Sequence, residues 1–125
     1  MFIREKEKTP PVEWGNGLSH RLVVATDRMG FTIADTLVRA GTKSRLQYRR
    51  HLEACYCISG RGQVLSADGS VQYDIRPGVL YALDRHDAHF LIADTGQDLR
   101  LISVFNPPLR GDEVHSLDET RFSEY

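Results

Sequence analysis

Residues 76–90 read RPGVLYALDRHDAHF, and this stretch points to the fold and to a functional site together. Pro77-Gly78 is a turn signal, and the five uncharged residues after it predict a buried strand over 79–83. The strand runs into two histidines and two aspartates grouped around Arg85. Imidazole and carboxylate groups are ligands that divalent metals accept, so we expect a metal site close to this turn.

Short strands separated by turns are expected along most of the chain. Residues 31–40 alternate apolar and polar side chains with the period of a strand, and Asp68-Gly69 predicts a hairpin. Gly60 and Gly62 indicate a kink or bulge. No segment shows a convincing helical period. Together with the stretch above, strands are expected over residues 20–25, 31–40, 44–49, 51–59, 63–66, 71–75, 90–93 and 99–105. This pattern predicts an all-β sandwich or small barrel.

Length and composition favour one soluble domain. The chain has 125 residues with 41% apolar content, so we expect a single domain over 1–125 with residues 109–125 as a polar tail. A net charge of -1 gives no electrostatic case for a nucleic-acid or membrane-surface partner. The charged N-terminal run lacks the apolar block of a signal peptide, and no apolar run reaches membrane-spanning length.

Cys55 and Cys57 lie two apart on one expected strand. Neighbours of this kind share a face but rarely pair, so we expect two reduced thiols and a cytoplasmic protein. The two thiols are either soft metal ligands or, as we favour, small side chains that fill the interior.

Two segments resemble the spaced motifs of cupins, which are small jelly-roll barrels. Glu53 is followed by six residues and Gly60, like the end of the first motif. Gly78 is followed by five residues, Asp84 and then His89, like the second motif, with His86 at its second glycine. The resemblance places Glu53 and His89 on metal-ligand positions. The two histidines usual in the first motif are missing, because residues 46–49 hold none.

Strand alternation offers a replacement ligand. Tyr81 lies on one face of its strand, so it is either a third ligand or a core aromatic with a bonded hydroxyl. Glu53 is alternatively a buried salt-bridge partner of Arg45 or Arg49. His86 and Asp87 are expected in a solvated turn. In the tail, Glu113 and His115 point the same way in an extended segment and belong either to one cavity or to a polar tail.

Three blocks in order resemble ectoine synthase, a divergent cupin family: HLEACYCISGRG (51–62), PGVLYALDRHDAHF (77–90) and VFNPPLRGDEVH (104–115). The resemblance implies a single-domain cupin barrel that binds Fe(II) through Glu53, Tyr81 and His89. It also implies a homodimer and a C-terminal tail over residues 109–125 that acts as a lid. This sequence departs from the family around Trp14, where GNGLSH stands before Arg21, at Cys55, and in the tail end SLDETRFSEY. The resemblance assigns substrate contacts to Trp14, Arg21, Thr36, Tyr48, Phe105, Glu113 and His115.

The resemblance further implies a carbon–oxygen hydro-lyase that closes N-γ-acetyl-L-2,4-diaminobutyrate into the cyclic amidine ectoine with loss of water. Acid–base groups are needed for that reaction, and the resemblance offers Tyr48, His51, Glu113 and His115. Two other functions remain open on the sequence. A three-ligand iron site also suits another metal-dependent cupin enzyme such as a dioxygenase, and a small cupin can serve as a binding module for a small molecule.

Overall fold

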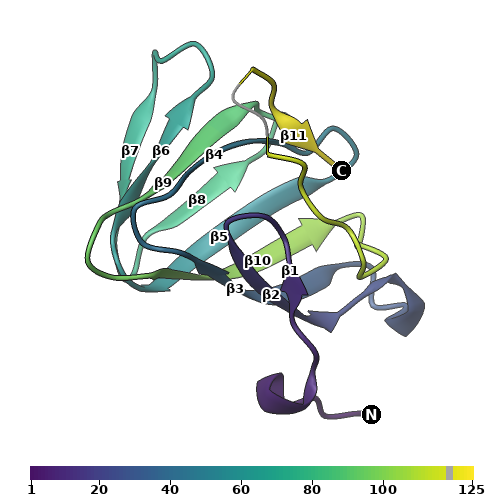
Figure 1. The fold of residues 1–125 in the computed structure, drawn as a ribbon. Coiled ribbons are helices and arrows are strands. Elements are labelled where there is room, and N and C mark those ends of the chain that lie inside the picture. The colour runs from purple at the N-terminus through teal and green to yellow at the C-terminus, as the bar shows by residue number, and fades with distance from the viewer. Residues whose placement is uncertain (118–119) are drawn as a thin grey trace.

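Two β-sheets that face each other make up most of the molecule (Figure 1). The structure is a computed structural model that describes residues 1–117 and 120–125. The six-stranded sheet has the order β1 (Val12–Glu13), β2 (Gly17–Val23), β3 (Thr32–Val38), β10 (Leu99–Asn106), β5 (Leu52–Ser59), β8 (Leu80–Leu83). The five-stranded sheet has the order β11 (Ser123–Glu124), β4 (Lys43–Gln47), β9 (His89–Ala93), β6 (Gly62–Ser66), β7 (Gln72–Ile75).

All the strand pairs are antiparallel except β11 with β4, which is parallel. Two 3-10 helices, η1 (Lys6–Lys8) and η2 (Ala25–Asp27), are the helical elements of the described residues. The all-β prediction is therefore confirmed. None of the described helices is long and apolar enough to cross a membrane.

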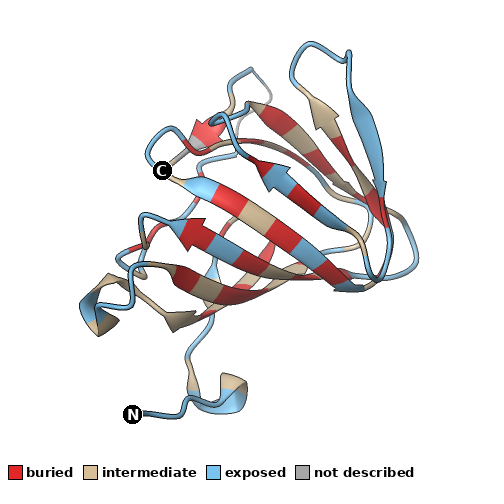
Figure 2. Cartoon of the chain, turned by 180° about the vertical axis from the view of Figure 1, so that it is seen from behind, coloured by how far each residue is buried: buried red, intermediate tan, exposed pale blue. Residues whose placement is uncertain are grey.

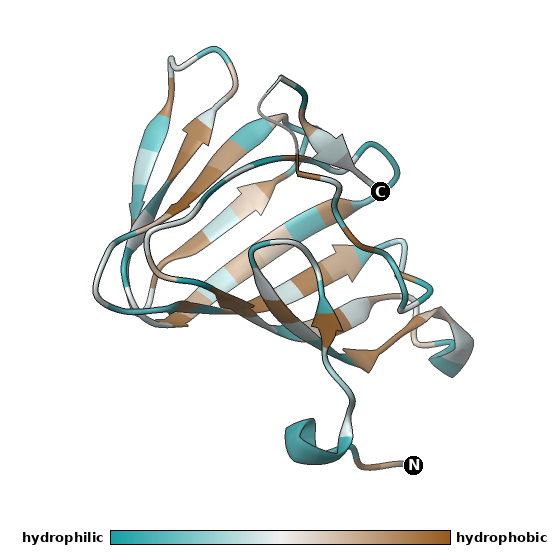
Figure 3. Ribbon diagram, viewed as in Figure 1, coloured by the Kyte–Doolittle hydropathy of each residue, from teal (hydrophilic) through white to brown (hydrophobic). Residues whose placement is uncertain are grey.

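The core lies between the two sheets because side chains alternate along each strand. In β10 the inward side chains Leu99, Leu101, Ser103 and Phe105 are buried, while the residues between them are more exposed. Figure 2 shows this alternation as stripes along the strands of the barrel. Burial of one such leucine contributes roughly 1.5–3 kcal/mol. The hydrophilic η1 helix, teal in Figure 3, lies outside this core near the N-terminus.

Two glycine turns confirm the sequence prediction. The Asp68-Gly69 hairpin joins β6 to β7, and the Asp68 carboxylate accepts hydrogen bonds from the Ser70 amide at 2.9 Å and the Ser66 hydroxyl at 2.8 Å. Gly60 adopts a φ of +82°, and a Cβ there would lie 2.3 Å from the carbonyl oxygen of Asp98. Only glycine fits that position without a shift of the backbone.

The tail is held against the six-stranded sheet by buried contacts. The Leu109 side chain is fully buried, its amide donates to the Thr32 hydroxyl at 2.8 Å, and its carbonyl accepts from the Ala25 amide at 2.8 Å. Further along, the His115 amide donates to the carbonyl of Trp14 at 2.9 Å. These bonds bring the tail back to the barrel, and β11 then adds to the edge of the other sheet.

Candidate active site

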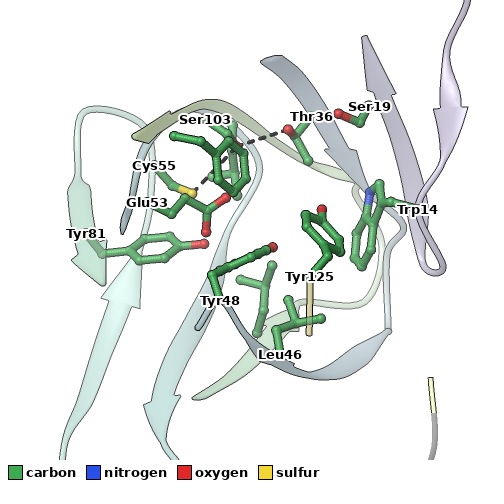
Figure 4. A pocket seen from close by; sticks show the side chains of 13 residues that line it. Trp14, Ser19, Thr36, Leu46, Tyr48, Glu53, Cys55, Tyr81, Ser103 and Tyr125 are labelled. Atoms are coloured by element: carbon green, nitrogen blue, oxygen red, sulfur yellow. Dashed lines mark hydrogen bonds between the residues drawn. The ribbon is translucent and has the colours of Figure 1, made fainter. Parts of the chain in front are cut away.

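Glu53 and Tyr81 face the barrel interior from adjacent strands. In the β5–β8 pair, Cys55 lies opposite Tyr81 and Glu53 lies opposite Leu83. Both Glu53 and Tyr81 are 7% exposed. Figure 4 shows the Tyr81 hydroxyl and the Glu53 carboxylate turned toward each other, with the Cys55 thiol beside them. Motif spacing predicts Glu53 and strand alternation together with the motifs predicts Tyr81, and both side chains are buried here.

His89 approaches from the facing sheet, as the first residue of β9. Its side chain is buried, and Nδ1 donates to the carbonyl of Asp87 at 2.9 Å, because a carbonyl can only accept. Burial lowers the pKa of His89, so the ring is neutral and Nε2 keeps its lone pair. Among the described residues, Nε2 has no hydrogen-bond partner. A backbone carbonyl bound to one ring nitrogen and a free lone pair on the other are typical of a metal-binding histidine.

The chemistry of these groups fits a divalent metal. No three His, Cys, Asp or Glu side chains in residues 1–117 and 120–125 are arranged to hold an ion by themselves, so the Tyr81 phenol would have to complete the site. Burial raises the pKa of Glu53 to about 8, and no ion pair of Glu53 occurs among the described residues. The alternative partner Arg45 instead places its guanidinium 5.3 Å from the Phe90 ring. A cation here would compensate a carboxylate that is otherwise costly to ionise.

A small cavity of about 30 Å³ adjoins Glu53 and Tyr81. Three polar groups line one side of it. The Ser103 hydroxyl lies 3.0 Å from the Thr36 hydroxyl and 3.6 Å from the Cys55 thiol. The complete lining consists of Trp14, Ser19, Thr36, Leu46, Tyr48, Glu53, Cys55, Tyr81, Leu91, Leu101, Ser103, Phe105 and Tyr125 (Figure 4).

A larger groove of about 600 Å³ also adjoins the candidate ligands. It runs between β7 and β8, the free edges of the two sheets, and its lining includes both Tyr81 and His89. Tyr81 lines both the small cavity and this groove, whereas Glu53 lines the cavity and His89 lines the groove.

Arg21 and Glu113 join the tail to the barrel wall. The Arg21 side chain is 3% exposed, and its Nη2 donates to the Glu113 carbonyl at 2.6 Å. Its Nη1 lies 3.5 Å from Glu113 Oε1 but makes no hydrogen bond with any described residue. Burial favours the neutral Glu113 carboxyl, but the amides of Gly111 and Arg110 and the Arg21 charge outweigh burial and lower its pKa. The site thus contains a buried cation with an unsatisfied donor.

His115 and Tyr48 form a buried hydrogen-bonded pair. His115 Nε2 lies 3.1 Å from the Tyr48 hydroxyl, and Nδ1 lies 2.9 Å from the Ser123 hydroxyl. Burial, together with the nearby His89 ring and the positive charge of Arg21, lowers the pKa of His115 to about 3. Burial also raises the pKa of Tyr48. Both groups are therefore neutral near pH 7, and the hydrogen bond with the imidazole orients the phenol.

Two of the three aromatic residues expected at the site, Trp14 and Phe105, lie at its walls. The Trp14 indole is buried and donates to the Leu37 carbonyl at 3.1 Å. The Phe105 ring packs edge-on against Tyr48 at 5.2 Å. His51 is absent from the lining of the small cavity; its Nδ1 lies 2.7 Å from the Pro107 carbonyl, and its ring contacts Phe105.

The structure thus brings most of the expected site residues around one interior. It also adds lining residues that the sequence did not indicate, chiefly Ser19, Ser103 and Tyr125. The inward position of Ser103 follows from alternation along β10, so that signal was present. Tyr125 follows a two-residue strand in a polar tail, and no local pattern places it. His86 and Asp87 are exposed, as expected of a solvated turn, although His86 Nδ1 also lies 2.9 Å from the Tyr48 carbonyl.

Comparison with known proteins assigns the family. A family model described as ectoine synthase matches residues 3–123. L-ectoine synthase of Wolinella succinogenes is 46% identical over 121 residues, which cover 92% of this chain and 91% of the relative. L-ectoine synthase of Halalkalibacterium halodurans is 43% identical over 104 residues, covering 83% of this chain and 79% of the relative. The chain belongs to the ectoine synthase family.

Solved structures agree with this assignment. The crystal structure of ectoine synthase from P. lautus matches with a TM-score of 0.83 and 39% identity, covering 89% of this chain and 81% of that one. An RmlC-like cupin from Shewanella frigidimarina matches with a TM-score of 0.70 at 19% identity, covering 86% and 91%, and this likeness concerns the fold alone. The predicted cupin barrel is confirmed, as is membership of an enzyme family of carbon–oxygen hydro-lyases.

Proposed function

We propose that this ectoine synthase family member closes N-γ-acetyl-L-2,4-diaminobutyrate into ectoine with loss of water. Family membership supports the reaction class. The observations that carry the proposal for this chain are the buried Glu53, Tyr81 and His89, with Nε2 of His89 unpartnered, and a buried arginine, Arg21, whose Nη1 donor is free among the described residues. An amino acid with a side-chain amide needs both features, one for its amide and one for its carboxylate.

Fe(II) is the metal we propose, held by Glu53, Tyr81 and His89. These offer a carboxylate, a phenol and an imidazole, a donor set suited to a metal of intermediate hardness. When bound, the metal would supply Lewis acidity to the amide oxygen, which is otherwise a poorly activated group. Asp87 fixes the ring nitrogen that faces away from the site, so His89 is oriented for this task before any ligand arrives.

Arg21 is the group we assign to the substrate carboxylate. Its buried Nη1 has no hydrogen-bond partner among the described residues, and a carboxylate would satisfy that donor. Glu113 is already held by two backbone amides, so it balances the arginine charge without occupying Nη1 fully. Trp14 and Phe105 give apolar walls, and the Thr36 hydroxyl adds a polar contact. Walls this close to one another favour a folded, ring-like conformer of the substrate and exclude water.

Proton transfers must accompany ring closure. The α-ammonium gives up two protons, a carbon–nitrogen bond forms, and the amide oxygen leaves as water. Tyr48 lines the cavity, whereas His115 lies behind it, so we assign proton donation toward the leaving oxygen to the Tyr48 hydroxyl. A histidine with a pKa of about 3 is a poor base near pH 7, and His115 is therefore assigned to orient Tyr48. The remaining candidates for deprotonation of the amine are Glu113 and His51.

The direct test is to incubate the purified protein with Fe(II) and the acetylated diamino acid and to follow the ring product by NMR. If fully metal-loaded protein gives no ring product, the acetylated diamino acid is not the substrate. Glu53→Ala, Tyr81→Ala and His89→Ala should each lose bound iron and cyclisation, whereas His86→Ala in the adjacent turn should keep its iron. If His86→Ala loses iron and Tyr81→Ala retains it, the assignment of Tyr81 as the third ligand is wrong.

We also infer a cytoplasmic homodimer. Cys55 and Cys57 are both free and buried, which agrees with a reducing compartment. The dimer rests on the family resemblance. Light scattering during size-exclusion chromatography tests it, since a dimer has twice the chain mass of 14.2 kDa.

A further inference from the structure

Tyr125 occupies the space in which the proposed substrate would bind. Its ring lies between Tyr48 and Trp14 in the cavity (Figure 4). The ring centroid lies 5.1 Å from that of Tyr48 and 4.2 Å from that of His115, and the Arg21 guanidinium lies 5.9 Å from it. Three of the side chains assigned to the substrate thus contact one aromatic ring of the protein itself.

The space left beside this ring is too small for a substrate. The cavity measures about 30 Å³. Since one water molecule needs about 10–15 Å³ of such space, the cavity holds a few water molecules at most. Pockets that hold small organic ligands measure on the order of 300–1,000 Å³. An acetylated diamino acid therefore needs room that the Tyr125 side chain now fills.

The segment that carries Tyr125 is a short strand at a sheet edge, and the Phe122 ring before it packs edge-on against Phe90 at 5.1 Å. β11 pairs with β4 over two residue pairs, Ser123 with Leu46 and Glu124 with Gln47. The Ser123 hydroxyl adds hydrogen bonds to His115 and to the Ser116 amide. Because β11 is the outermost strand of its sheet, its release leaves all other strand pairs intact. Short edge segments of this kind open at low free-energy cost relative to the core.

We propose that the Tyr125 side chain is an intramolecular competitor of the substrate, which it excludes from the cavity until the residues around β11 release. This inference rests on the proposed function for the identity of the competing ligand. It makes Tyr125 a determinant of substrate affinity, because only the fraction of molecules with an open cavity can bind. The ring, rather than the hydroxyl, is the part that fills the space.

The first experiment measures access to the cavity without any substrate. Cys55 lines the cavity and Cys57 does not, so a small methylthiolating reagent should distinguish them, with peptide fragmentation locating each label. Full-length Tyr125→Ala should react at Cys55 about tenfold faster than the unaltered protein, while Cys57 keeps its rate. Tyr125→Phe keeps the ring and should behave like the unaltered protein. Tyr73→Ala removes an exposed tyrosine and is the matched control.

The second experiment measures affinity in the same variants. Binding of the acetylated diamino acid is followed through Trp14, the single tryptophan, and KM is measured on iron-loaded protein. Tyr125→Ala should lower both the dissociation constant and KM by about threefold or more, and Tyr125→Phe should leave them unchanged.

Unchanged Cys55 labelling in Tyr125→Ala would overturn the proposal. Equal acceleration at both cysteines would overturn it as well, because that result reports general unfolding. A higher KM in Tyr125→Ala would show instead that the ring covers bound substrate. If Cys55 alone reacts faster but the diamino acid binds no variant, the proposed substrate fails while exclusion by Tyr125 stands.

Discussion

The buried His115 should make the protein sensitive to acid, and the size of this effect follows from its pKa. The folded protein holds this pKa at about 3, compared with 6.5 for a solvated histidine side chain. Below pH 6.5 the unfolded chain binds a proton at His115 that the folded protein does not bind. The part of the unfolding free energy that depends on neutral His115 is therefore fully present above pH 6.5 and is lost as pH falls toward 3. At about 1.4 kcal/mol per unit, the full range amounts to about 5 kcal/mol, and about 3 kcal/mol is lost by about pH 4.5.

Urea denaturation at about pH 7.0 and about pH 4.5, with chelator present throughout, measures this loss. His115→Gln should lose about 3 kcal/mol less than the unaltered protein between the two pH values, whatever its stability at neutral pH. All the groups that face His115 remain in the variant: Trp14, Arg21, Tyr48, His89, Ser123 and Tyr125. His20→Gln, which changes a histidine bonded to the Thr9 carbonyl, is the matched control. An acid loss in His115→Gln equal to that of the unaltered protein would refute the reasoning.

Three further changes test how the barrel holds the tail and turns its corners. Thr32→Val leaves the buried Leu109 amide without its acceptor and should lower the unfolding free energy, measured in urea, by about 1–3 kcal/mol. An unchanged unfolding free energy would show that this hydrogen bond does not stabilise the fold. Leu109→Ala empties a fully buried site and should cost about 2–5 kcal/mol, and the exposed Leu117→Ala, at less than about 1 kcal/mol, is its control. Gly60→Ala should lower the thermal midpoint well below that of Gly69→Ala, because both glycines have positive φ but only Gly60 would place its Cβ against the Asp98 carbonyl; equal midpoints would contradict this.

The barrel was predictable because its signals are local. Cupin motif spacing indicated Glu53, and alternation in 79–83 and 51–59 added Tyr81, so the two could be named together before the strands were seen side by side. The position of His89 came from motif spacing rather than from alternation. Fe(II), the homodimer and the individual catalytic roles stay predictions.

The tail could not be predicted from pattern because long-range bonds determine its place. Arg21 and Glu113 are 92 residues apart in the chain, and nothing local to either residue indicates the contact. Glu113 and His115 were first interpreted as either cavity or tail residues, and both are buried. Tyr125 had no signal at all, since its strand is two residues long and pairs in parallel with a distant segment.

The groove between β7 and β8 gives the candidate ligands two separate approaches. Tyr81 and His89 can be reached from this outer side, while Tyr125 stands on the inner side. We therefore predict that the proposed metal ion exchanges through the groove without passing Tyr125. A chelator should consequently remove the metal from the unaltered protein and from Tyr125→Ala at the same rate.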